Sequence, residues 1–250
     1  MSGHSKWAGI KHKKAIIDAK RGKEFTKAAA NITIAAKQGG GDPKMNFSLR
    51  LAIDKAKAVN MPAVNIERAI KKGTGELGGA APEELLYEGY AQAGVAVLIE
   101  ALTDNRNRTG PEVRAAFSKH GGSTAETGAV SFQFEKVGEI IANRKDQVLS
   151  PEEIELVILD SGADDFEETD DEYIIYTEST GLQKAKEALI SGGVKISDDD
   201  IIYKPKNEVR VNDIEVARKI LKLIDAIEDI EDVTTVYSNY DIPDEIMEQL

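Results

Sequence analysis

The order of strand-like and helix-like segments in the second half of the chain constrains its fold most strongly. Between Glu139 and Ile202 the pattern reads strand, helix, strand, strand, helix, strand. This is the order of a split β-α-β unit of the ferredoxin-like kind, in which both helices cover one face of an antiparallel sheet. The segments before and after it each read strand, helix, strand, and we expect them to pair with each other across the middle unit.

Local signals mark the helices and strands of this part. A capping box pairs an N-cap side chain with a Glu or Gln three residues later, and it marks a helix start. Four occur, at Thr109 with Glu112, Ser150 with Glu153, Thr180 with Gln183, and Asn212 with Glu215. Strands are predicted where β-branched or alternating residues occur, at 95–99, 130–134, 172–177 and 233–237.

Apolar residues recur at helical spacing in three stretches before residue 74, and glycine or proline ends each of them. The sequence therefore predicts a multi-domain protein of α and α+β class. An N-terminal helical bundle with a basic arm occupies 1–75. Two ferredoxin-like α+β domains follow, a second domain formed by 80–136 together with 205–242 and a third domain, 137–204, inserted into it.

Charge is distributed very unevenly along the chain. Residues 1–73 contain 16 Lys and Arg against 5 Asp and Glu, whereas the remaining residues contain 16 against 39. Such asymmetry is typical of a protein whose basic end faces a polyanion. The alternative is a solvated, lysine-rich helix face, but such faces usually carry interspersed acids, which are scarce here.

The basic arm carries the candidate nucleic-acid-binding residues. They are Lys6, Trp7, Lys11, His12, Lys13, Lys14, Lys20, Arg21, Lys23 and Lys27. Because small residues separate these cations, we expect the segment before Phe25 to be poorly ordered alone and to order on a phosphate backbone. Trp7 is suited to stacking on an unpaired base, as in RNA or single strands, and equally to anchoring a core.

Two further motifs contain residues suited to anion binding. The segment 73–78 matches G-x-G-x-x-G, but a helix precedes it and a linker follows, so its glycines are predicted to cap and hinge rather than to bind a nucleotide. In the segment 103–112, Arg106 and Arg108 are further candidate nucleic-acid-binding residues, because they lie beside the start of a predicted helix, where its dipole attracts anions. They could instead pair with acids such as Glu88 or Glu100.

No catalytic motif stands out. The acid runs at 164–172 and Asp198 to Asp200 lack the spacing of a calcium loop and are predicted to be solvated loops. With three histidines and no cysteine, general bases are few, so a metal-dependent phosphate-ester enzyme is a remote alternative. We predict no cofactor, no metal site and no small-molecule substrate. No apolar stretch is long enough to cross a membrane and no secretory leader is recognisable, so a cytoplasmic location is expected.

Four stretches of the chain are distinctive: the opening SGHSKWAGIKHKKAIIDAKRGKEFTK, NMPAVNIERAIKKGTGE at 60–76, YEGY at 87–90, and GVAVLIEALTDNRNRT at 94–109. Together they resemble the YebC/PmpR family. The resemblance implies three domains and a cytoplasmic, non-enzymatic protein. Family members include bacterial proteins described as transcriptional regulators and a mitochondrial translational activator. Binding of DNA is ascribed to some, and helping ribosomes through proline-rich stretches to others.

The resemblance places the family's basic motif on the arm and its TDNxNRT signature on 103–109. The chain departs from the family pattern in two loops, at 91–94 and 123–125. The sequence thus predicts a regulator of gene expression that binds DNA through its basic N-terminal region. A ribosome-associated translation factor that binds ribosomal RNA is the alternative, because phosphate contacts do not distinguish the two nucleic acids.

Overall fold

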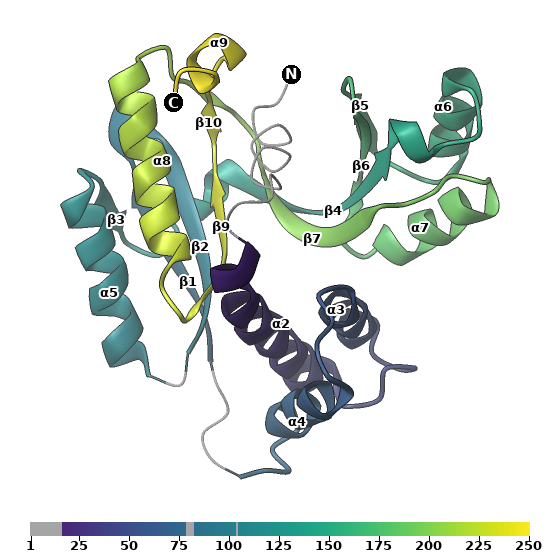
Figure 1. The fold of residues 1–250 in the computed structure, drawn as a ribbon, viewed down its shortest axis with the longest axis horizontal. Helices are drawn as coiled ribbons and strands as arrows, with labels where there is room; N and C mark the ends of the chain where they lie inside the picture. Colours follow the sequence, from purple (N-terminus) through teal and green to yellow (C-terminus); the bar gives the residue numbers. More distant parts are fainter. Residues whose placement is uncertain (1–16, 79–82, 104) are drawn as a thin grey trace. The chain divides into compact units, whose positions relative to one another are not determined.

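The computed structural model describes residues 17–78, 83–103 and 105–250, and the side chains of residues 17–24 are not described. The chain forms two compact units (Figure 1). One unit is Phe134–Lys206, and the other is built from the chain before and after it. No helix within the described ranges is long and apolar enough to span a bilayer.

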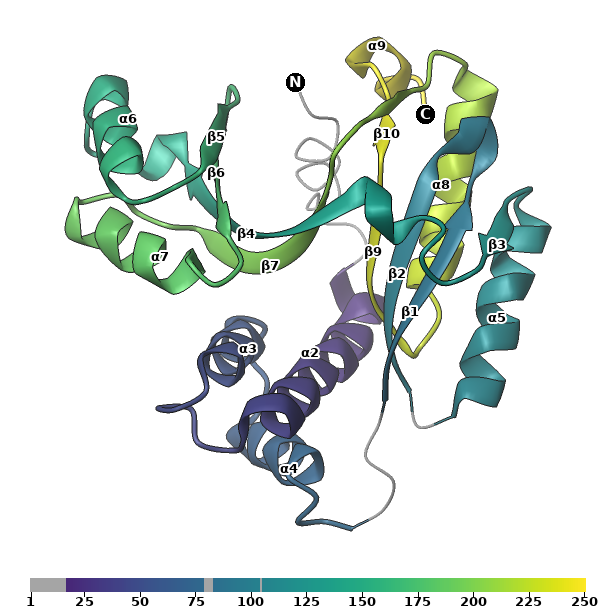
Figure 2. The same ribbon diagram turned by 180° about the vertical axis from the view of Figure 1, so that it is seen from behind.

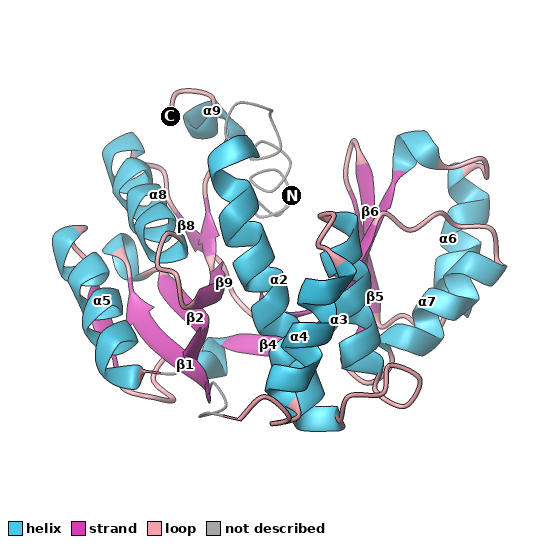
Figure 3. Cartoon of the chain, turned by 60° about the horizontal axis from the view of Figure 1, so that its bottom comes forward, coloured by secondary structure: helices cyan, strands magenta, loops and turns pink. Residues whose placement is uncertain are grey.

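The basic third of the chain is helical, as predicted, with α2 (Ile17–Gly39), α3 (Phe47–Ala58) and α4 (Ala63–Gly73). Figure 3 shows α2, α3 and α4 as helices, and they are consecutive elements of the chain. Helix α2 begins at Ile17, so the stretch 17–24, which we expected to be unordered without a partner, is helical. Buried apolar residues from the three helices and from the loop between α3 and α4 form one core. They include Ile32, Ala36, Leu49, Ile53, Ala56, Met61, Ile66 and Ala69.

One buried asparagine joins the end of α2 to the start of α3. Asn46 is the N-cap of α3, and its Oδ1 accepts a hydrogen bond from Leu49 N at 3.0 Å. Its Nδ2 donates to the carbonyl oxygens of Ala35 at 2.7 Å and Gly40 at 2.8 Å. The side chain therefore satisfies backbone groups at two helix ends, which would otherwise lack partners.

The second domain contains an antiparallel sheet in the order β3-β1-β2-β9. Its strands are β1 (Glu83–Tyr90), β2 (Ala96–Thr103), β3 (Ser123–Ala125) and β9 (Val233–Ser238). Helices α5 (Arg106–Lys119) and α8 (Ile214–Glu228) cover one face (Figures 1 and 2). The sequence did not predict β1, and the segment 123–125, which was assigned to a loop, is strand β3. Because β1 and β2 form a hairpin in the middle of the sheet, this domain is α+β but does not follow the ferredoxin-like order.

The predicted strand at 130–134 is wrong. Ser131–Gln133 is a short 3-10 helix, and the strand that follows, β4, begins at Phe134. The reason is the buried carboxylate of Glu88, which accepts hydrogen bonds from the backbone N–H groups of Gly128, Val130 and Ser131 at 2.7, 2.5 and 2.9 Å. These donors are therefore not available to a strand ladder.

The unit Phe134–Lys206 has the predicted ferredoxin-like arrangement. Its sheet has the order β5-β6-β4-β7, with β4 (Phe134–Asn143), β5 (Asp165–Glu168), β6 (Glu172–Glu178) and β7 (Asp198–Pro205). Helices α6 (Pro151–Asp160) and α7 (Leu182–Ser191) pack on it. The buried residues of this unit include Ile140, Ala142, Ile154, Ile158, Tyr173, Ile175, Leu182, Ala185 and Leu189.

The short elements near the C-terminus complete the second domain. A parallel pair joins β8 (Val209–Arg210) to β10 (Tyr240–Asp241), and α9 (Asp244–Met247) follows. The side chain of Asn239 links this region to β2, because its Oδ1 accepts a hydrogen bond from Ala96 N at 2.7 Å.

Only one of the four predicted capping boxes is present. Ser150 and Glu153 form it at the start of α6. At α5 the N-cap is Asn105 instead of Thr109, and at α8 it is Asp213, one residue after the predicted Asn212. Helix α7 has Gly181 as its N-cap and no side-chain cap, so the box at Thr180 is wrong. The four helices nevertheless exist close to where they were predicted.

The insertion of the third domain remains a prediction about independent folding. A fragment of residues 134–206 contains a complete sheet with both of its helices, and we expect it to unfold cooperatively in urea. A fragment of residues 80–133 lacks β9 and α8, so its apolar sheet face would be bare, and we expect no cooperative transition. Circular dichroism during urea titration measures both. Cooperative unfolding of the isolated fragment 80–133 would contradict the insertion.

Candidate nucleic-acid interface

The predicted binding residues of the arm fall into two groups. Lys6, Trp7, Lys11, His12, Lys13 and Lys14 lie outside the described residues. Lys20, Arg21, Lys23 and Lys27 belong to α2, and among their side chains only that of Lys27, which is half-buried, is described. The cationic arm therefore continues into the first turns of a helix.

The helical domain beyond the arm is also cationic. Residues 25–73 contain nine Lys and Arg against three Asp and Glu. Two of the acids are paired within their own helices, Asp54 with Lys57 at 3.7 Å and Glu67 with Lys71 at 2.7 Å. Arg68 and Lys72 on α4 are exposed and form no ion pair with any residue that the structure describes.

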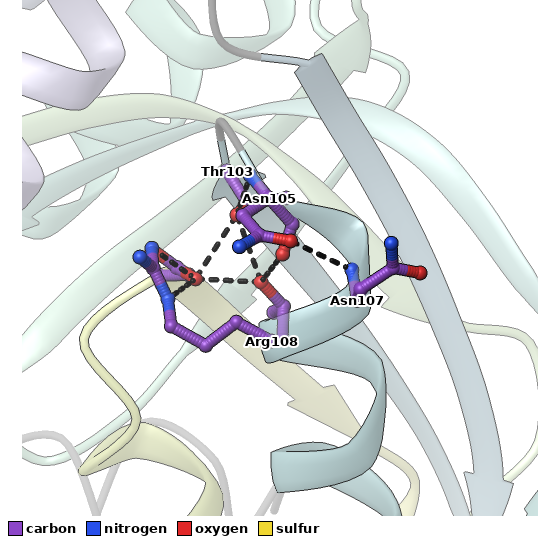
Figure 4. A network of polar contacts seen from close by, with 6 residues as sticks. Thr103, Asn105, Asn107 and Arg108 are labelled. Carbon is purple, nitrogen blue, oxygen red and sulfur yellow. Dashed lines mark hydrogen bonds and ion pairs between the residues drawn. The ribbon is translucent and has the colours of Figure 1, made fainter.

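The turn between β2 and α5 is held by a polar network (Figure 4). Its centre is the carboxylate of Asp232, which precedes β9 and is largely buried. Arg108 donates through Nη2 to Asp232 Oδ1 at 2.7 Å and to Oδ2 at 2.9 Å. The Thr103 hydroxyl donates to Oδ2 at 3.0 Å, and the Thr109 hydroxyl lies 2.5 Å from the same oxygen. One carboxylate thus fixes both ends of the segment 103–109.

The start of α5 is capped within the same turn. The Oδ1 of Asn105 accepts a hydrogen bond from Asn107 N at 3.1 Å, and Asn105 N donates to the Thr103 hydroxyl at 2.9 Å. The side chain of Asn107 points away from the network (Figure 4) and is exposed. Asp104 lies outside the described residues.

Both arginines of this turn form ion pairs, as one of the two interpretations of the sequence allowed. The partners differ from those proposed, because Arg108 binds Asp232 and Arg106 binds Glu83 at 2.5 Å. Glu88 instead holds the loop 128–131, and the carboxylate of Glu100 accepts a hydrogen bond from the Tyr237 hydroxyl at 3.1 Å. Arg108 therefore positions the turn, whereas the Arg106 pair is exposed on both sides, and exposed pairs contribute little.

The two buried carboxylates of this domain stay ionised for the same reason. Burial alone would raise the pKa of Asp232, but hydrogen bonds from Arg108, Thr109 and Thr103 outweigh it, so the pKa lies below the ordinary value. Burial likewise opposes ionisation of Glu88, and its three backbone hydrogen bonds lower the pKa overall. Both groups need the charged form to keep their partners.

No sequence signal marks Asp232, because the residues that it holds are more than a hundred positions away in the chain. The cations of α4 were also missed, since Lys71 and Lys72 were interpreted only as the end of a helix. Their spacing contained a usable signal: Arg68 and Lys72 are one helical turn apart, on the side of α4 away from Ile66 and Gly73.

The acid runs of the third domain lie mostly in strands β5, β6 and β7, so the prediction of solvated loops is wrong, and three of these acids pair with lysines. Lys186 pairs with the largely buried Asp199 at 2.7 Å. Lys204 pairs with Glu167 at 3.2 Å and with Asp165 at 3.9 Å. No cluster of three or more metal-ligating side chains occurs among residues 17–78, 83–103 and 105–250.

Replacement of Asp232 tests the network. Asp232→Asn removes the charge that Arg108 faces and disrupts the hydroxyl bonds, and we expect it to lower the free energy of unfolding by about 1 to 3 kcal/mol. Because the folded-state pKa is depressed, the ionised carboxylate stabilises the fold above its unfolded pKa of about 3.9, and this contribution is lost as the pH falls toward the folded-state value.

The variant should therefore lose less stability than the natural protein when the pH is lowered through this range. Urea titrations at several pH values measure the difference. The Arg108→Ala, Asp232→Asn double variant should have a free energy of unfolding only slightly lower than that of either single variant. Strictly additive losses would contradict a shared network.

The chain was compared with known proteins. Residues 5–76 match the family model of the TACO1/YebC protein N-terminal domain, and residues 82–240 match that of the TACO1/YebC second and third domain. A probable transcriptional regulatory protein of Halothermothrix orenii is 51% identical over 250 residues, covering 100% of this chain and 99% of that protein. One of Persephonella marina is 51% identical over 251 residues, covering 100% of both.

A solved structure is similar along almost the whole chain. It is the crystal structure of a conserved hypothetical protein from Aquifex aeolicus, which is 48% identical and superposes with a TM-score of 0.86. The match covers 95% of this chain and 97% of that one. The family models together with these relatives show that the chain belongs to the TACO1/YebC family.

Proposed function

We propose that this protein is a non-enzymatic, cytoplasmic regulator of gene expression that binds nucleic acid, with DNA as the target, through its basic N-terminal region. The observation that carries the proposal is the charge asymmetry. The first 73 residues have 16 basic and 5 acidic side chains, and the other residues have 16 and 39. Lys and Arg that neutralise phosphates release condensed counterions, which is the main source of affinity for a nucleic-acid backbone.

The acidic remainder of the chain restricts where a polyanion can bind. Like charges repel, so an approaching nucleic acid is oriented toward the N-terminal region. The exposed Arg68 and Lys72 of α4 extend the cationic surface beyond the arm. Relatives that are about half identical are described as probable transcriptional regulatory proteins, which supports the proposal.

Catalysis is not part of the proposal. Asp199, the most buried of the acids considered for a metal-dependent enzyme, forms an ion pair with Lys186. Lys204 neutralises the nearest acids of β5. These contacts give the acids a structural role in the ferredoxin-like unit, and the relatives are described as regulators.

Charge reversal in the arm tests the proposal. If the arm contacts four to six phosphates, the slope of log affinity against log salt is about −3 to −5. The Lys13→Glu, Lys14→Glu variant should weaken binding to all sequences alike and make the slope shallower by about 1.4 to 1.8. Fluorescence anisotropy with labelled DNA and RNA oligonucleotides at several salt concentrations measures this.

The matched control is Lys219→Glu, Lys222→Glu, which makes the same change of charge at two exposed positions of α8. Equal effects of the two variants would show that only net charge matters, and would contradict a specific role of the arm.

The kind of target is decided in a cell lysate. A DNA-binding regulator should be recovered crosslinked to promoter DNA, with little protein sedimenting with ribosomes at low salt. If the protein instead sediments with ribosomes, and the Lys13→Glu, Lys14→Glu variant does not, the target is ribosomal RNA rather than DNA. Trp7, which is suited to base stacking, is the residue that favours this second candidate.

A further inference from the structure

Helices α2 and α4 approach each other closely because small residues meet at their crossing. The hydroxyl of Thr33 on α2 lies 2.8 Å from the Ala29 carbonyl oxygen and 3.2 Å from the Ala69 carbonyl oxygen of α4. At Gly73 an added Cβ would lie only 2.4 Å from the carbonyl oxygen of Thr33. The contact therefore leaves no room for a larger side chain, and it fixes the spacing of the two helices.

Long cationic side chains lie beside this helix–helix contact. Arg68 and Lys72 are four residues apart on the exposed side of α4, and successive positions of this spacing lie about 6 Å apart along a helix. Together with Lys27 of α2 and Asn65 of α4 they line a common cavity. We call the surface formed by Lys27, Asn65, Arg68 and Lys72 the α2–α4 groove.

The groove is positive on the side that the helical domain contributes. None of the helical-domain residues that line the cavity is acidic, whereas its opposite wall, from the second domain, includes Glu231, Asp232 and the Arg108 that pairs with Asp232. The one acid within α4, Glu67, is bound by Lys71 at 2.7 Å, and the first turn of α4 contains no acid. Arg68 and Lys72 have no ion-pair partner among the described residues and remain exposed. Their charges are therefore available to an anion.

We propose that the α2–α4 groove binds one strand of nucleic acid by its phosphodiester backbone, as a second contact beside the arm. Guanidinium and ammonium groups are the side chains that bind phosphate oxygens most often, and arginine does so through two parallel hydrogen bonds. The amide of Asn65 adds a neutral donor to the same surface. The inference rests on the proposed function, because the arm supplies the first contact with the strand.

A groove built on packed helices differs from the arm in its effect on binding. The backbone positions of its cations are fixed by helix packing, so only side-chain entropy is lost when they meet phosphates. Contacts to the backbone carry no sequence information, so the groove should increase affinity for every sequence. It should also increase the number of phosphates that the protein neutralises.

Charge reversal in the groove is the first test, in the full-length protein. Arg68→Glu, Lys72→Glu should weaken binding of labelled 20-mers and make the salt slope shallower by about 1.4 to 1.8, as for two lost phosphate contacts. Lys219→Glu, Lys222→Glu again controls for net charge. DNA and RNA 20-mers, single-stranded and double-stranded, show which source of phosphodiester the groove prefers.

The outcomes separate the two proposals. If Lys13→Glu, Lys14→Glu weakens binding but the groove variant behaves like the control, the proposal that the groove binds nucleic acid is wrong, and the proposal for the arm is retained. If the natural protein binds none of the oligonucleotides at low salt, the proposed function fails and the groove with it. Circular dichroism must show unchanged helix content, which we expect because both side chains are exposed.

A second test exploits the absence of cysteine from this chain. A photoactivatable crosslinker attached to the Lys72→Cys variant should form a covalent adduct with a labelled oligonucleotide, and an excess of unlabelled oligonucleotide should compete with it. The same crosslinker on the Lys222→Cys variant should give at most a trace of adduct. Two results would contradict binding in the groove. One is an equal amount of adduct at positions 72 and 222, and the other is no adduct at position 72 under conditions in which the protein binds the oligonucleotide.

Discussion

The carboxylate of Asp232 connects parts of the second domain that are far apart in the sequence. It precedes β9 and binds the end of β2 and the first turn of α5 through Thr103, Arg108 and Thr109. A buried charge is tolerated only where donors replace the water that it loses, and three side chains provide them here. Together with the β2–β9 ladder and the apolar core under α8, this satisfied carboxylate joins β9 to the start of α5.

Other connections follow the same principle. Glu88 binds three N–H groups of the loop that leads into β4, and Asn46 satisfies backbone groups at the ends of α2 and α3. In each case a single buried polar side chain replaces a regular ladder or helix bond. Since an unpaired buried polar group is costly, each of these residues specifies one loop conformation rather than merely adding stability.

The contrast between local and long-range signals explains which predictions were confirmed. Helices with an apolar stripe, such as α2 and α8, were predicted because burial of that stripe produces a visible period. Strand β1 was missed since its sequence EELLYEGY mixes acids with apolar residues, and one of those acids, Glu88, is buried. The strand expected at 130–134 does not form because Glu88, more than forty residues earlier, captures its donors.

The candidate interface follows the same division. The arm and the charge asymmetry are properties of composition, so they were visible in the sequence. The roles of Arg106 and Arg108 depended on partners that the sequence could not identify, since Asp232 is distant and Glu83 lies in an unpredicted strand. The close approach of α2 and α4 at Gly73 is likewise a tertiary property, and the spacing of cations on either side of it follows from that contact.

The pairing of β2 with β9 has a consequence for synthesis of the chain. Glu100 and Thr235 are opposite each other in this ladder, so the sheet of the second domain is complete only after nearly the whole polypeptide has been made. The unit Phe134–Lys206 is continuous and has emerged before then. Because domains fold as units during translation, the ferredoxin-like unit can form while β2 still has an unpaired edge. During that interval the unpaired edge of β2 can pair with a strand of another chain.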